Sequence, residues 1–544
     1  MGSFRDKLKE LFAKITGQST SQSRQRASVE DLYPNKHTEG RQSPSPAQRQ
    51  PERLTPQTPP SQSVRAQNIS ASPETKATQG KLNVRDPYFF QIGFDFGTSS
   101  SKAVIRDINT DRAWVYTQSI SYGRDAFLIP SVVLYRNGNF ERHLDIETMY
   151  PEGGLYHLKM AAEKVATGIA NAPILAAYQR LLGQNSLYKP ALITKLACVY
   201  LLASAFSDII ASVIQKFPSY GQNADDQMAI NMAIPVSNIS DSRIRSFFER
   251  ILNISWKLAW EPGSFPKKIP ILDLAKKVEL HELWFTEHGD DELCHVYPEV
   301  SANVQAFVRS PASSPDMRTI YFFSDTGAGT VDQSVFTYAG GAGRRLNYFS
   351  AGVFSRGSSQ IEITACGSTI DEEKLEYWRK EKEQGKDSGI LTRAKMQVGE
   401  ALKADTGKTL RDTLACLPFG TGGISPANTL KENIKFIFSG GGHAEFPYQL
   451  AVTDAYKDSL RTIGEPLVTS MARPPDLEVP KEYSHWVNRL YVAYGLSFLF
   501  HDLAENTFPS DNKIDPAEVT SAKKCSCNGR NKNCLKCYGT GVVQ

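Results

Sequence analysis

The sequence predicts an α/β protein, and three of its features lead to that prediction. Short apolar runs that suit buried strands alternate with longer segments of helical periodicity through most of the 544 residues. Two loops containing glycine and threonine each follow such a strand-like run. Hydrophobic residues make up 40% of the chain, which suffices for a large buried core. We therefore expect strands and helices in alternation, with the two loops at strand ends.

The N-terminal segment differs from the rest of the chain. Residues 1–16 place apolar side chains at helical spacing with basic residues elsewhere, which predicts an amphipathic helix. Such a helix could dock in a partner groove or lie at a membrane surface, although isolated helices this short are marginally stable. Residues 17–87 are rich in Ser, Gln, Pro, Thr and Arg, so we expect a disordered linker there.

The two loops each carry acidic residues at fixed places. They are residues 95–102, DFGTSSSK, and residues 325–332, DTGAGTVD. Glycine lets backbone N–H groups approach an anion, hydroxyl side chains add donors, and an aspartate can hold a hydrated magnesium ion. Two such loops suggest one phosphate chain that is clamped from both sides.

These loops resemble the phosphate loops of the actin–sugar kinase–DnaK ATPase superfamily, whose two pseudo-equivalent lobes each offer a loop to ATP. The second loop is similar to that of the DnaK heat-shock chaperones, whereas sugar kinases usually carry a different one. Further stretches resemble the family in the family's order: 129–133, 156–159, 233–236, 298–302, 400–403, 439–447 and 492–495. Only the paired loops retain a trace of the family's internal duplication.

The resemblance implies a two-lobed actin-like/DnaK-like ATPase fold for residues 88–515. Lobe I would comprise about 88–318 and 481–505, and lobe II about 319–480. Two helical segments fit within these lobes. Residues 191–206 are apolar nearly all round and predict a core helix, while residues 371–404 are charged and predict helix with a break around 385–389.

The resemblance also implies the site residues. The catalytic residues would be Asp95, Lys159, Glu299, Asp325 and Asp332. Asp95 and Asp325 would hold magnesium through water, and Glu299 and Asp332 could orient or deprotonate the attacking water. The phosphates would contact Gly97, Thr98, Ser99, Lys102, Gly327, Ala328, Gly329 and Thr330. The adenosine would contact Glu400, Lys403, Gly440, Gly441, Gly442 and His443.

One departure from the family concerns this adenosine loop. Where the family has an arginine that can stack on adenine through its planar face, this chain has Glu445. His443 stands in place of the family's serine and could stack instead, or could be an ordinary surface histidine. The nucleotide preference is therefore left open.

The C-terminal residues 516–544 predict a small zinc module. Cys525, Cys527, Cys534 and Cys537 fall close together, which suits tetrahedral thiolate ligation. Residues 534–541 resemble half of a DnaJ cysteine-rich repeat, but the first pair is spaced C-x-C rather than C-x-x-C. A tail of reactive or redox-active surface thiols is the alternative.

Composition limits the remaining classes of function. The chain has 62 basic and 58 acidic residues, so a role in binding nucleic acid is not expected. No apolar run reaches the ~18 residues that span a bilayer, and no secretory signal is visible. We expect a cytoplasmic protein, for which the N-terminal helix offers peripheral attachment to a membrane.

These features together predict an ATP-binding nucleotide switch that hydrolyses ATP slowly and acts through a protein partner. About a hundred residues follow Pro447, which leaves no room for the β-sandwich and lid of a DnaK chaperone, so the peptide-binding module is expected to be missing. Two alternatives remain. One is a polymerising actin-like or FtsA-like scaffold tethered by the N-terminal helix, and the other is a small-molecule kinase.

Overall fold

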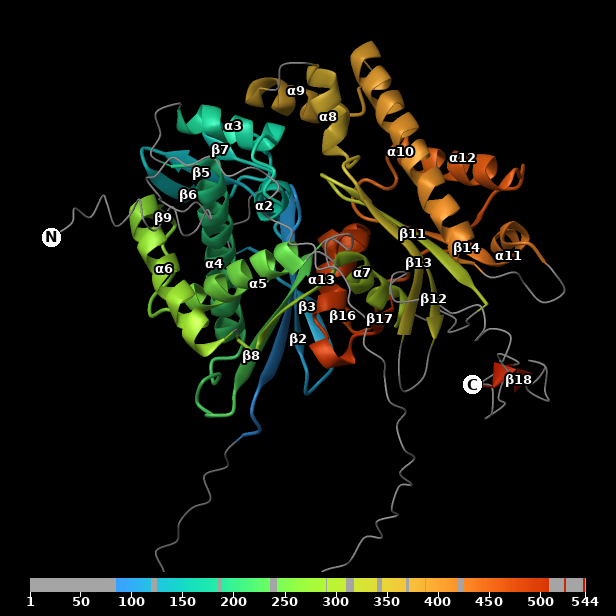
Figure 1. Ribbon diagram of the computed structural model, residues 1–544. Coiled ribbons are helices and arrows are strands. Elements are labelled where there is room, and N and C mark those ends of the chain that lie inside the picture. The colour runs from blue at the N-terminus through green and yellow to red at the C-terminus, as the bar shows by residue number, and fades with distance from the viewer. Residues whose placement is uncertain are drawn as a thin grey trace, which may run out of the picture. The chain divides into compact units, whose positions relative to one another are not determined.

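The computed structural model describes residues 85–507 apart from some internal gaps, and the pairs 523–524 and 542–543. The gaps are 119–124, 184–187, 235–241, 290, 310–317, 340–344, 368–370, 387 and 418–423. The described residues form two large sheets, a smaller sheet and the helices around them (Figure 1), which confirms the predicted α/β class. The predicted N-terminal helix, nearly all of the linker and the four tail cysteines lie outside the described residues.

The first large sheet contains the first glycine-containing loop. Its strands follow the order β10 (Cys294–Pro298), β8 (Gln227–Ile234), β1 (Phe89–Asp95), β2 (Ser100–Asp107), β3 (Arg112–Val115) and β16 (Leu477–Glu478), with β4 (Ile129–Pro130) paired to β2 off this path. Strands β1, β2 and β3 are antiparallel neighbours, whereas β8 runs parallel to β1 and β10 parallel to β8.

The second large sheet repeats this arrangement around the second loop. Its strands follow the order β15 (Leu467–Val468), β14 (Ile434–Ser439), β11 (Ile320–Thr326), β12 (Val331–Ala339), β13 (Arg345–Phe354) and β17 (Glu505–Thr507). Strands β11, β12 and β13 are antiparallel, β14 and β15 continue in parallel on one side, and β17 is parallel to β13 on the other. The internal correspondence therefore extends to whole sheets, well beyond the paired loops seen in the sequence.

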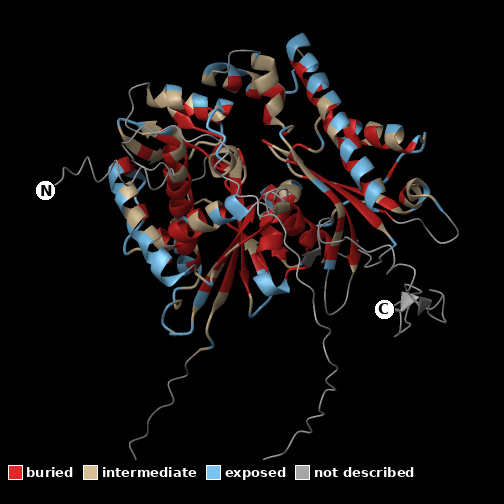
Figure 2. Cartoon of the chain, in the orientation of Figure 1, coloured by how far each residue is buried: buried red, intermediate tan, exposed pale blue. Residues whose placement is uncertain are grey.

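Both faces of the second sheet are covered, which explains why its strands are continuously apolar. Along β11, Ile320 and Phe322 belong to one buried cluster, and Tyr321 and Phe323 belong to another. Successive side chains of a strand point to opposite faces, so a strand that is covered on both sides needs apolar residues at every position. Figure 2 shows the strands of this sheet as mostly buried.

Helix α7 (Glu299–Val308) packs against both large sheets. Its valines join the core of the second sheet, while Ala302 joins the core that contains first-sheet strands and α13 (Tyr491–Leu496). A Cβ atom on Gly495 would lie 1.8 Å from the carbonyl oxygen of Ala302, so α13 and α7 can cross only because this residue is glycine. The VAYG stretch of the sequence is therefore a helix-crossing site.

The smaller sheet and several helices flank the first large sheet. The smaller sheet has the order β7 (Gly154–Leu155), β5 (Val133–Arg136), β6 (Asn139–Arg142) and β9 (Lys268–Pro270). The helices are α2 (Leu158–Ala166), α3 (Pro173–Leu182), α4 (Pro190–Lys216), α5 (Ser242–Ala259) and α6 (Ile271–His288).

Helix α4 is the predicted core helix and is longer than expected. Nearly all its residues from Leu192 to Phe206 are buried, and α4 packs against α5 and α2. Among the described residues, it alone is long and apolar enough to cross a membrane by length and composition, which the sequence analysis did not anticipate. Most of its apolar stretch is buried inside the protein, as in the core helix of a globular fold (Figure 2).

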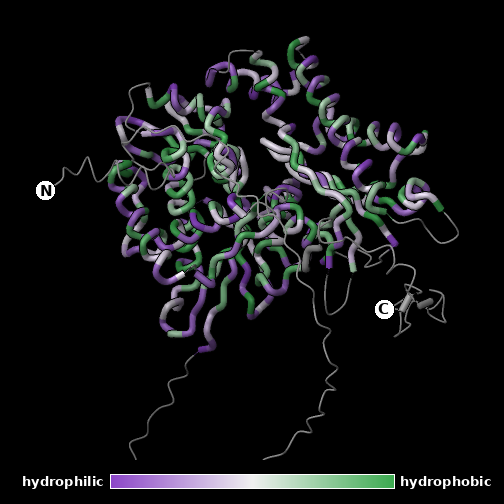
Figure 3. The backbone as a smooth tube through the Cα atoms, viewed as in Figure 1, coloured by the Kyte–Doolittle hydropathy of each residue, from purple (hydrophilic) through white to green (hydrophobic). Residues whose placement is uncertain are grey.

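The remaining helices belong mainly to the second half of the chain. They are α8 (Ser359–Cys366), α9 (Glu372–Glu383), α10 (Gly389–Cys416), α11 (Pro426–Asn433), α12 (Tyr448–Leu460) and the 3₁₀ helices η3 (Lys481–Arg489) and η4 (Phe500–Asp502). The break between α9 and α10 confirms the predicted interruption. Ser388 caps α10 by accepting a hydrogen bond from the Leu391 N–H at 3.2 Å. Figure 3 shows hydrophilic and apolar residues interspersed along α10.

Candidate functional site

The two glycine-containing loops contact each other in the folded protein. A Cβ atom on Gly329 would lie 2.6 Å from Oγ1 of Thr98 and 2.8 Å from Sδ of Met160, so no larger residue fits at position 329 without displacing its neighbours. The first loop closes the β1–β2 hairpin and the second closes the β11–β12 hairpin. The two loops predicted to hold one ligand are thus close enough to do so.

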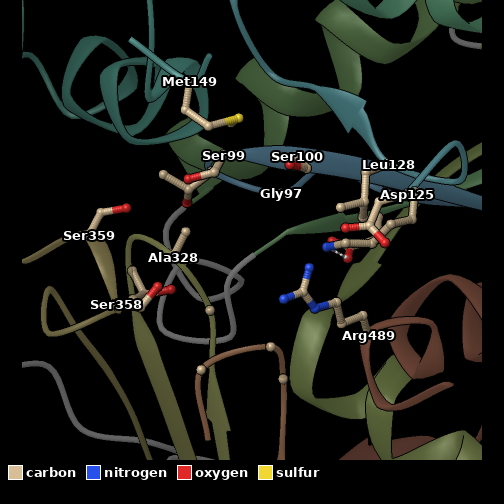
Figure 4. A pocket seen from close by; sticks show the side chains of 18 of the residues that line it. Gly97, Ser99, Ser100, Asp125, Leu128, Met149, Ala328, Ser358, Ser359 and Arg489 are labelled. Carbon is tan, nitrogen blue, oxygen red and sulfur yellow. Dashed lines mark hydrogen bonds and ion pairs between the residues drawn. The ribbon is translucent and has the colours of Figure 1, made fainter. Parts of the chain in front are cut away.

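Both loops line one cavity of about 470 Å³. Figure 4 shows Gly97, Ser99 and Ser100 on one side of it and Ala328, Ser358 and Ser359 on another. The cavity brings together most of the predicted site residues. Those that line it are Asp95, Gly97, Thr98, Ser99, Lys102, Lys159, Glu299, Asp325, Gly327, Ala328, Thr330, Gly440, Gly441 and Gly442.

The first loop is supported by the neighbouring stretch 129–133. The Ser131 N–H donates to the Ser99 carbonyl oxygen at 2.8 Å, and the buried hydroxyls of Ser101 and Ser131 hydrogen-bond at 2.9 Å. A Cβ atom on Gly97 would lie 2.1 Å from the Ser100 carbonyl oxygen, so the loop requires glycine there. The stretch that resembles a family motif therefore holds the loop in place.

The second loop lies beside the triple-glycine loop 440–442. The Gly442 N–H donates to the Thr326 carbonyl oxygen at 3.0 Å. Gly440 has a positive φ of 83°, and a Cβ atom on it would lie 2.1 Å from Oδ1 of Asp325. Glycine is needed there both for the backbone conformation and for the close approach. Bare backbone thus adjoins the Asp325 carboxylate.

An ion pair between α2 and α7 crosses the site. Lys159 and Glu299 form a salt bridge, and both side chains line the cavity. Burial alone would lower the pKa of Lys159, but the carboxylates of Glu299, Asp95 and Asp332 raise it above its usual range. Lys159 therefore stays protonated and places a positive charge beside three acidic side chains.

The two aspartates of the second hairpin are buried, and burial disfavours their ionised forms. Burial, reinforced by the carboxylates of Glu299 and Asp95, raises the pKa of Asp325 to about 7. Asn303 donates to Oδ2 of Asp325 at 2.8 Å and offsets part of this rise. Burial and the Glu299 carboxylate also raise the pKa of Asp332 well above its usual range, although Thr330 donates to it at 2.9 Å.

Three buried carboxylates each have one oxygen without a hydrogen-bond partner among the described residues: Oδ1 of Asp95, Asp325 and Asp332. Such atoms are costly unless a cation or water satisfies them. Within the described part of the chain, no group of three or more His, Cys, Asp or Glu side chains is arranged to hold a metal ion directly. Carboxylate oxygens of this kind can accept hydrogen bonds from water that is bound to a divalent cation.

Two predicted adenosine contacts do not reach the cavity. Glu400 is exposed on α10, and Lys403 pairs with Asp458 of α12 at 2.8 Å. The buried stripe of α10 passes through Val398, Gly399 and Leu402, so Glu400 and Lys403 lie on a different part of the helix circumference. The two residues share one helix, as their spacing predicts, but the orientation of α10 turns both away from the cavity.

Three further predicted residues have supporting positions. His443 donates through Nδ1 to the Gly440 carbonyl oxygen at 2.6 Å and contacts the Asn488 amide at 3.3 Å, so it supports the glycine loop. Gly329 lies where the two loops touch, and Asp332 accepts a hydrogen bond from the Thr330 hydroxyl. None of these three is among the residues that line the cavity.

Helix α9 contributes to the site in a way that was not predicted from the sequence. Lys382 pairs with Glu362 of α8 at 2.7 Å, and both side chains are nearly fully buried. On the same helix, Glu376 accepts hydrogen bonds from the N–H groups of Met149 and Tyr150 at 3.1 and 3.2 Å. This helix was interpreted only as charged, although its charges at three- and four-residue spacing could have indicated a functional face. It connects the two sides of the cavity.

Asn303 and Arg489 were also missed. Asn303 follows Glu299 by one helical turn and donates to both Asp325 and Ser439, at 2.8 and 3.1 Å. The i,i+4 spacing after Glu299 was a usable signal for it. Arg489 ends η3 and lines the cavity, but nothing in its local sequence marks it as a site residue.

Comparison with models of known protein families gives no match, and comparison with curated protein sequences gives none either. The resemblance to the DnaK-like ATPases therefore rests on the short motifs of the chain. Chemically, the site combines glycine backbone, hydroxyl groups, three lysines and several buried carboxylates around one cavity. That combination suits a ligand with several negative charges that arrives with a divalent cation.

Proposed function

We propose that the protein binds ATP with magnesium, hydrolyses it slowly to ADP and phosphate, and acts as a DnaK-like nucleotide switch on a protein partner. The observation that carries this proposal is the contact between the two loops, with Gly329 against Thr98 at the edge of one shared cavity. A polyphosphate chain in that cavity would touch both hairpins at once, as the paired loops of the superfamily require.

The matching strand orders of the two sheets support a two-lobed actin-like fold, with one sheet at the core of each lobe. Two short strands refine the expected boundaries. β16 pairs with β3 of the first sheet, although residues 477–478 fall in the expected lobe II, and β17 pairs with β13 of the second sheet. The chain would thus return from lobe II to lobe I before residue 477 and pass back to lobe II near residue 505.

In this proposal the loops hold the phosphates and the acidic residues handle the water. Backbone N–H groups of the glycines and the hydroxyls of Thr98, Ser99 and Thr330 would donate to phosphate oxygens. Magnesium, when bound, would neutralise phosphate charge and would contact Asp95 and Asp325 through water. Lys159 would add a second positive charge beside the terminal phosphate.

Asp332 and Glu299 are the proposed acceptors for a proton of the attacking water. Asp332 does not line the cavity itself but contacts Thr330, which does, so it would act through the Thr330 hydroxyl that donates to it at 2.9 Å. Glu299 is held in place by its ion pair with Lys159. Two acceptors in a buried, strongly acidic site are expected to give catalysis that depends mainly on positioning and charge.

The switch would depend on how ATP contacts both halves of the site. A ligand shifts a conformational equilibrium only by its differential affinity for the two states. ATP would contact both hairpins when they are close together, whereas ADP would lose the contacts of the terminal phosphate. A protein partner that prefers one arrangement would then sense which nucleotide is bound.

The direct test is phosphate release from magnesium-ATP by the purified chain without any added acceptor. We expect slow release that Gly329→Val abolishes, because the new side chain would collide with Thr98 and keep the loops apart. Gly389→Ala is the matched control, since a Cβ atom there would meet nothing within 4 Å. Release that requires a small-molecule acceptor would favour a kinase instead, and ATP-dependent light scattering would favour a polymerising scaffold.

The tail is proposed to bind one zinc ion per chain through Cys525, Cys527, Cys534 and Cys537. These cysteines lie, in sequence, between β18 (Lys523–Lys524) and β19 (Val542–Val543), which pair in antiparallel register. A strand pair that closes the segment is compatible with a small metal module. Elemental analysis should find one zinc per chain in metal-replete protein, and a zinc-free result would contradict the proposal.

The N-terminal helix of residues 1–16 is proposed to attach a cytoplasmic protein to a membrane surface or to a groove of its partner. Its apolar face and basic residues support either target. Flotation with lipid vesicles that contain no protein separates the two targets, because only a helix that binds membrane would carry the chain upward with the vesicles. The experiment compares the chain with and without residues 1–16. A chain that floats equally well without these residues would contradict the membrane target.

A further inference from the structure

One arginine side chain covers the bare backbone of the glycine loop 440–442. A Cβ atom on Gly441 would lie 3.0 Å from Nε of Arg489, so the arginine packs directly on this glycine. Figure 4 shows the Arg489 guanidinium directed into the cavity on the side of Asp125 and Leu128. Arg489 belongs to η3, so it comes from a different part of the chain than the loop that it covers.

The guanidinium of Arg489 is positioned by an aromatic ring and has spare bonding capacity. Its central carbon lies 3.8 Å from the ring centroid of Trp486, which also lines the cavity. Within the described residues, Nε of Arg489 is buried without a hydrogen-bond partner. Burial lowers the pKa of Arg489, and the carboxylates of Asp125 and Glu383 oppose that shift. A charge held this way, at a cavity, is costly unless a ligand contacts it.

The neighbours of Arg489 differ from those of the two lysines that would serve phosphate. Lys102 and Lys159 serve the hairpin loops and pair with Asp95 and Glu299 there. Arg489 instead lies beside a tryptophan and against glycine backbone, which is a surface that suits a flat ring. A planar guanidinium stacks on aromatic faces, whereas an ammonium group does not stack in this way.

We propose that Arg489 stacks on the base of the bound nucleotide and favours purines over pyrimidines. This inference rests on the proposed nucleotide binding. The glycine loop itself offers no planar cation, because residues 439–447 contain no arginine and Glu445 lines the cavity there. A purine presents a larger face than a pyrimidine to the guanidinium, so stacking favours ATP and GTP over CTP.

The test compares a nucleotide with its phosphates alone. Isothermal titration of the full chain with ATP, CTP and inorganic tripolyphosphate, each with magnesium, would be done for the wild type and for Arg489→Ala. We expect ATP affinity to fall about tenfold in the variant, while tripolyphosphate affinity stays within about twofold. The preference for ATP over CTP should shrink with it. Arg489→Lys should not restore ATP affinity, because the ammonium group is not planar.

Arg393→Ala is the matched control, since Arg393 is an exposed arginine of α10 that does not line the cavity. Arg489→Gln serves as a second variant if Arg489→Ala does not fold, and retained tripolyphosphate binding confirms that a variant is folded. Equal losses for ATP and tripolyphosphate would make Arg489 a phosphate ligand and overturn the inference. Unchanged ATP affinity would overturn it too, with the proposed function intact. A wild type that binds neither ligand would refute both.

Discussion

The two hairpins that line the cavity share a register but differ in charge. In the β1–β2 hairpin Asp95 lies opposite Lys102, and the lysine contacts the carboxylate at 2.8 Å. In the β11–β12 hairpin the corresponding positions are Asp325 and Asp332, two buried acids directly opposite each other. The first hairpin therefore neutralises its own aspartate, whereas the second accumulates negative charge.

This difference in charge indicates which of the two hairpins a bound ligand would stabilise more. Burial raises the pKa of both Asp325 and Asp332, so the second hairpin bears an energetic cost in the unliganded protein. The Lys159 charge lowers the pKa of Asp332, but Glu299 already pairs with this lysine. A cation that enters with a polyphosphate would relieve the second hairpin more than the first. Sites commonly trade stability for function in this way.

The largest expected effect is on turnover. Asp332→Asn should reduce phosphate release from magnesium-ATP by about 100-fold or more, because general-base catalysis and charge complementarity are lost together. Asp95→Asn should cause a comparable loss by disturbing the contact to the hydrated cation. Asp458→Asn on α12 is the control, since its carboxylate pairs with Lys403 away from the cavity. Wild-type turnover in a folded Asp332→Asn protein would contradict the assignment.

The next effect is on thermal stability, where the two hairpins should respond in opposite directions. In metal-free buffer, Asp332→Asn should stabilise the protein by about 1–3 kcal/mol, because it replaces a buried carboxyl whose ionised form the fold opposes by a neutral amide. Asp95→Asn should destabilise it by a similar amount, because Lys102 loses its partner.

Melting curves of the two variants in a chelator test this opposition. Adding Lys102→Met to Asp95→Asn should recover part of the loss, since the unpaired cation is then gone. Changes of the same sign in both single variants would show that the two hairpins do not differ in the way their charges indicate.

A smaller effect should follow from magnesium alone. At about ten times its dissociation constant, magnesium should stabilise the wild type by about 1.4 kcal/mol. Asp325→Asn should lose most of this gain, because the carboxylate oxygen that lacks a partner is replaced by a neutral amide. Calcium in place of magnesium provides a comparison for ion size. An equal magnesium-dependent rise in melting temperature for both proteins would place the cation elsewhere.

The smallest expected effect comes from removing residues 1–85. The charge difference between the hairpins is internal to residues 95–332, so basal phosphate release should stay within about twofold of the full chain. Measuring turnover of both forms under the same conditions checks this. If turnover falls with the truncation, the basic N-terminal arm contributes charge to the site. The charges of the two hairpins alone would then not account for turnover.

Much of the local structure could be predicted because it depends on local sequence. The continuously apolar run before Asp325 is a strand covered on both faces, and the interruption near Gly385 separates α9 from α10. The glycines of both loops were recognised because close backbone approach excludes other residues. Gly97 and Gly329 each meet a neighbouring atom where a Cβ would be. Apolar periodicity, continuous apolar runs and the positions of glycines can all be read from a short stretch of residues.

Other features depend on tertiary packing and could not be inferred in this way. Glu400 and Lys403 have the right spacing for a shared helix face, but the second sheet determines which face of α10 turns inward. The cavity contact of Arg489 arises because η3 packs against a loop almost fifty residues earlier in the chain.

The sequence by itself determined the α/β class and the positions of the two loops, and it predicted which residues would bind phosphate, because these follow from short-range pattern and chemistry. Only the tertiary structure decided that the loops meet at Thr98 and Gly329 and that both sheets share one strand order. Those features arise from contacts between residues hundreds of positions apart. No local pattern records them, because packing of the whole core selects which distant side chains become neighbours.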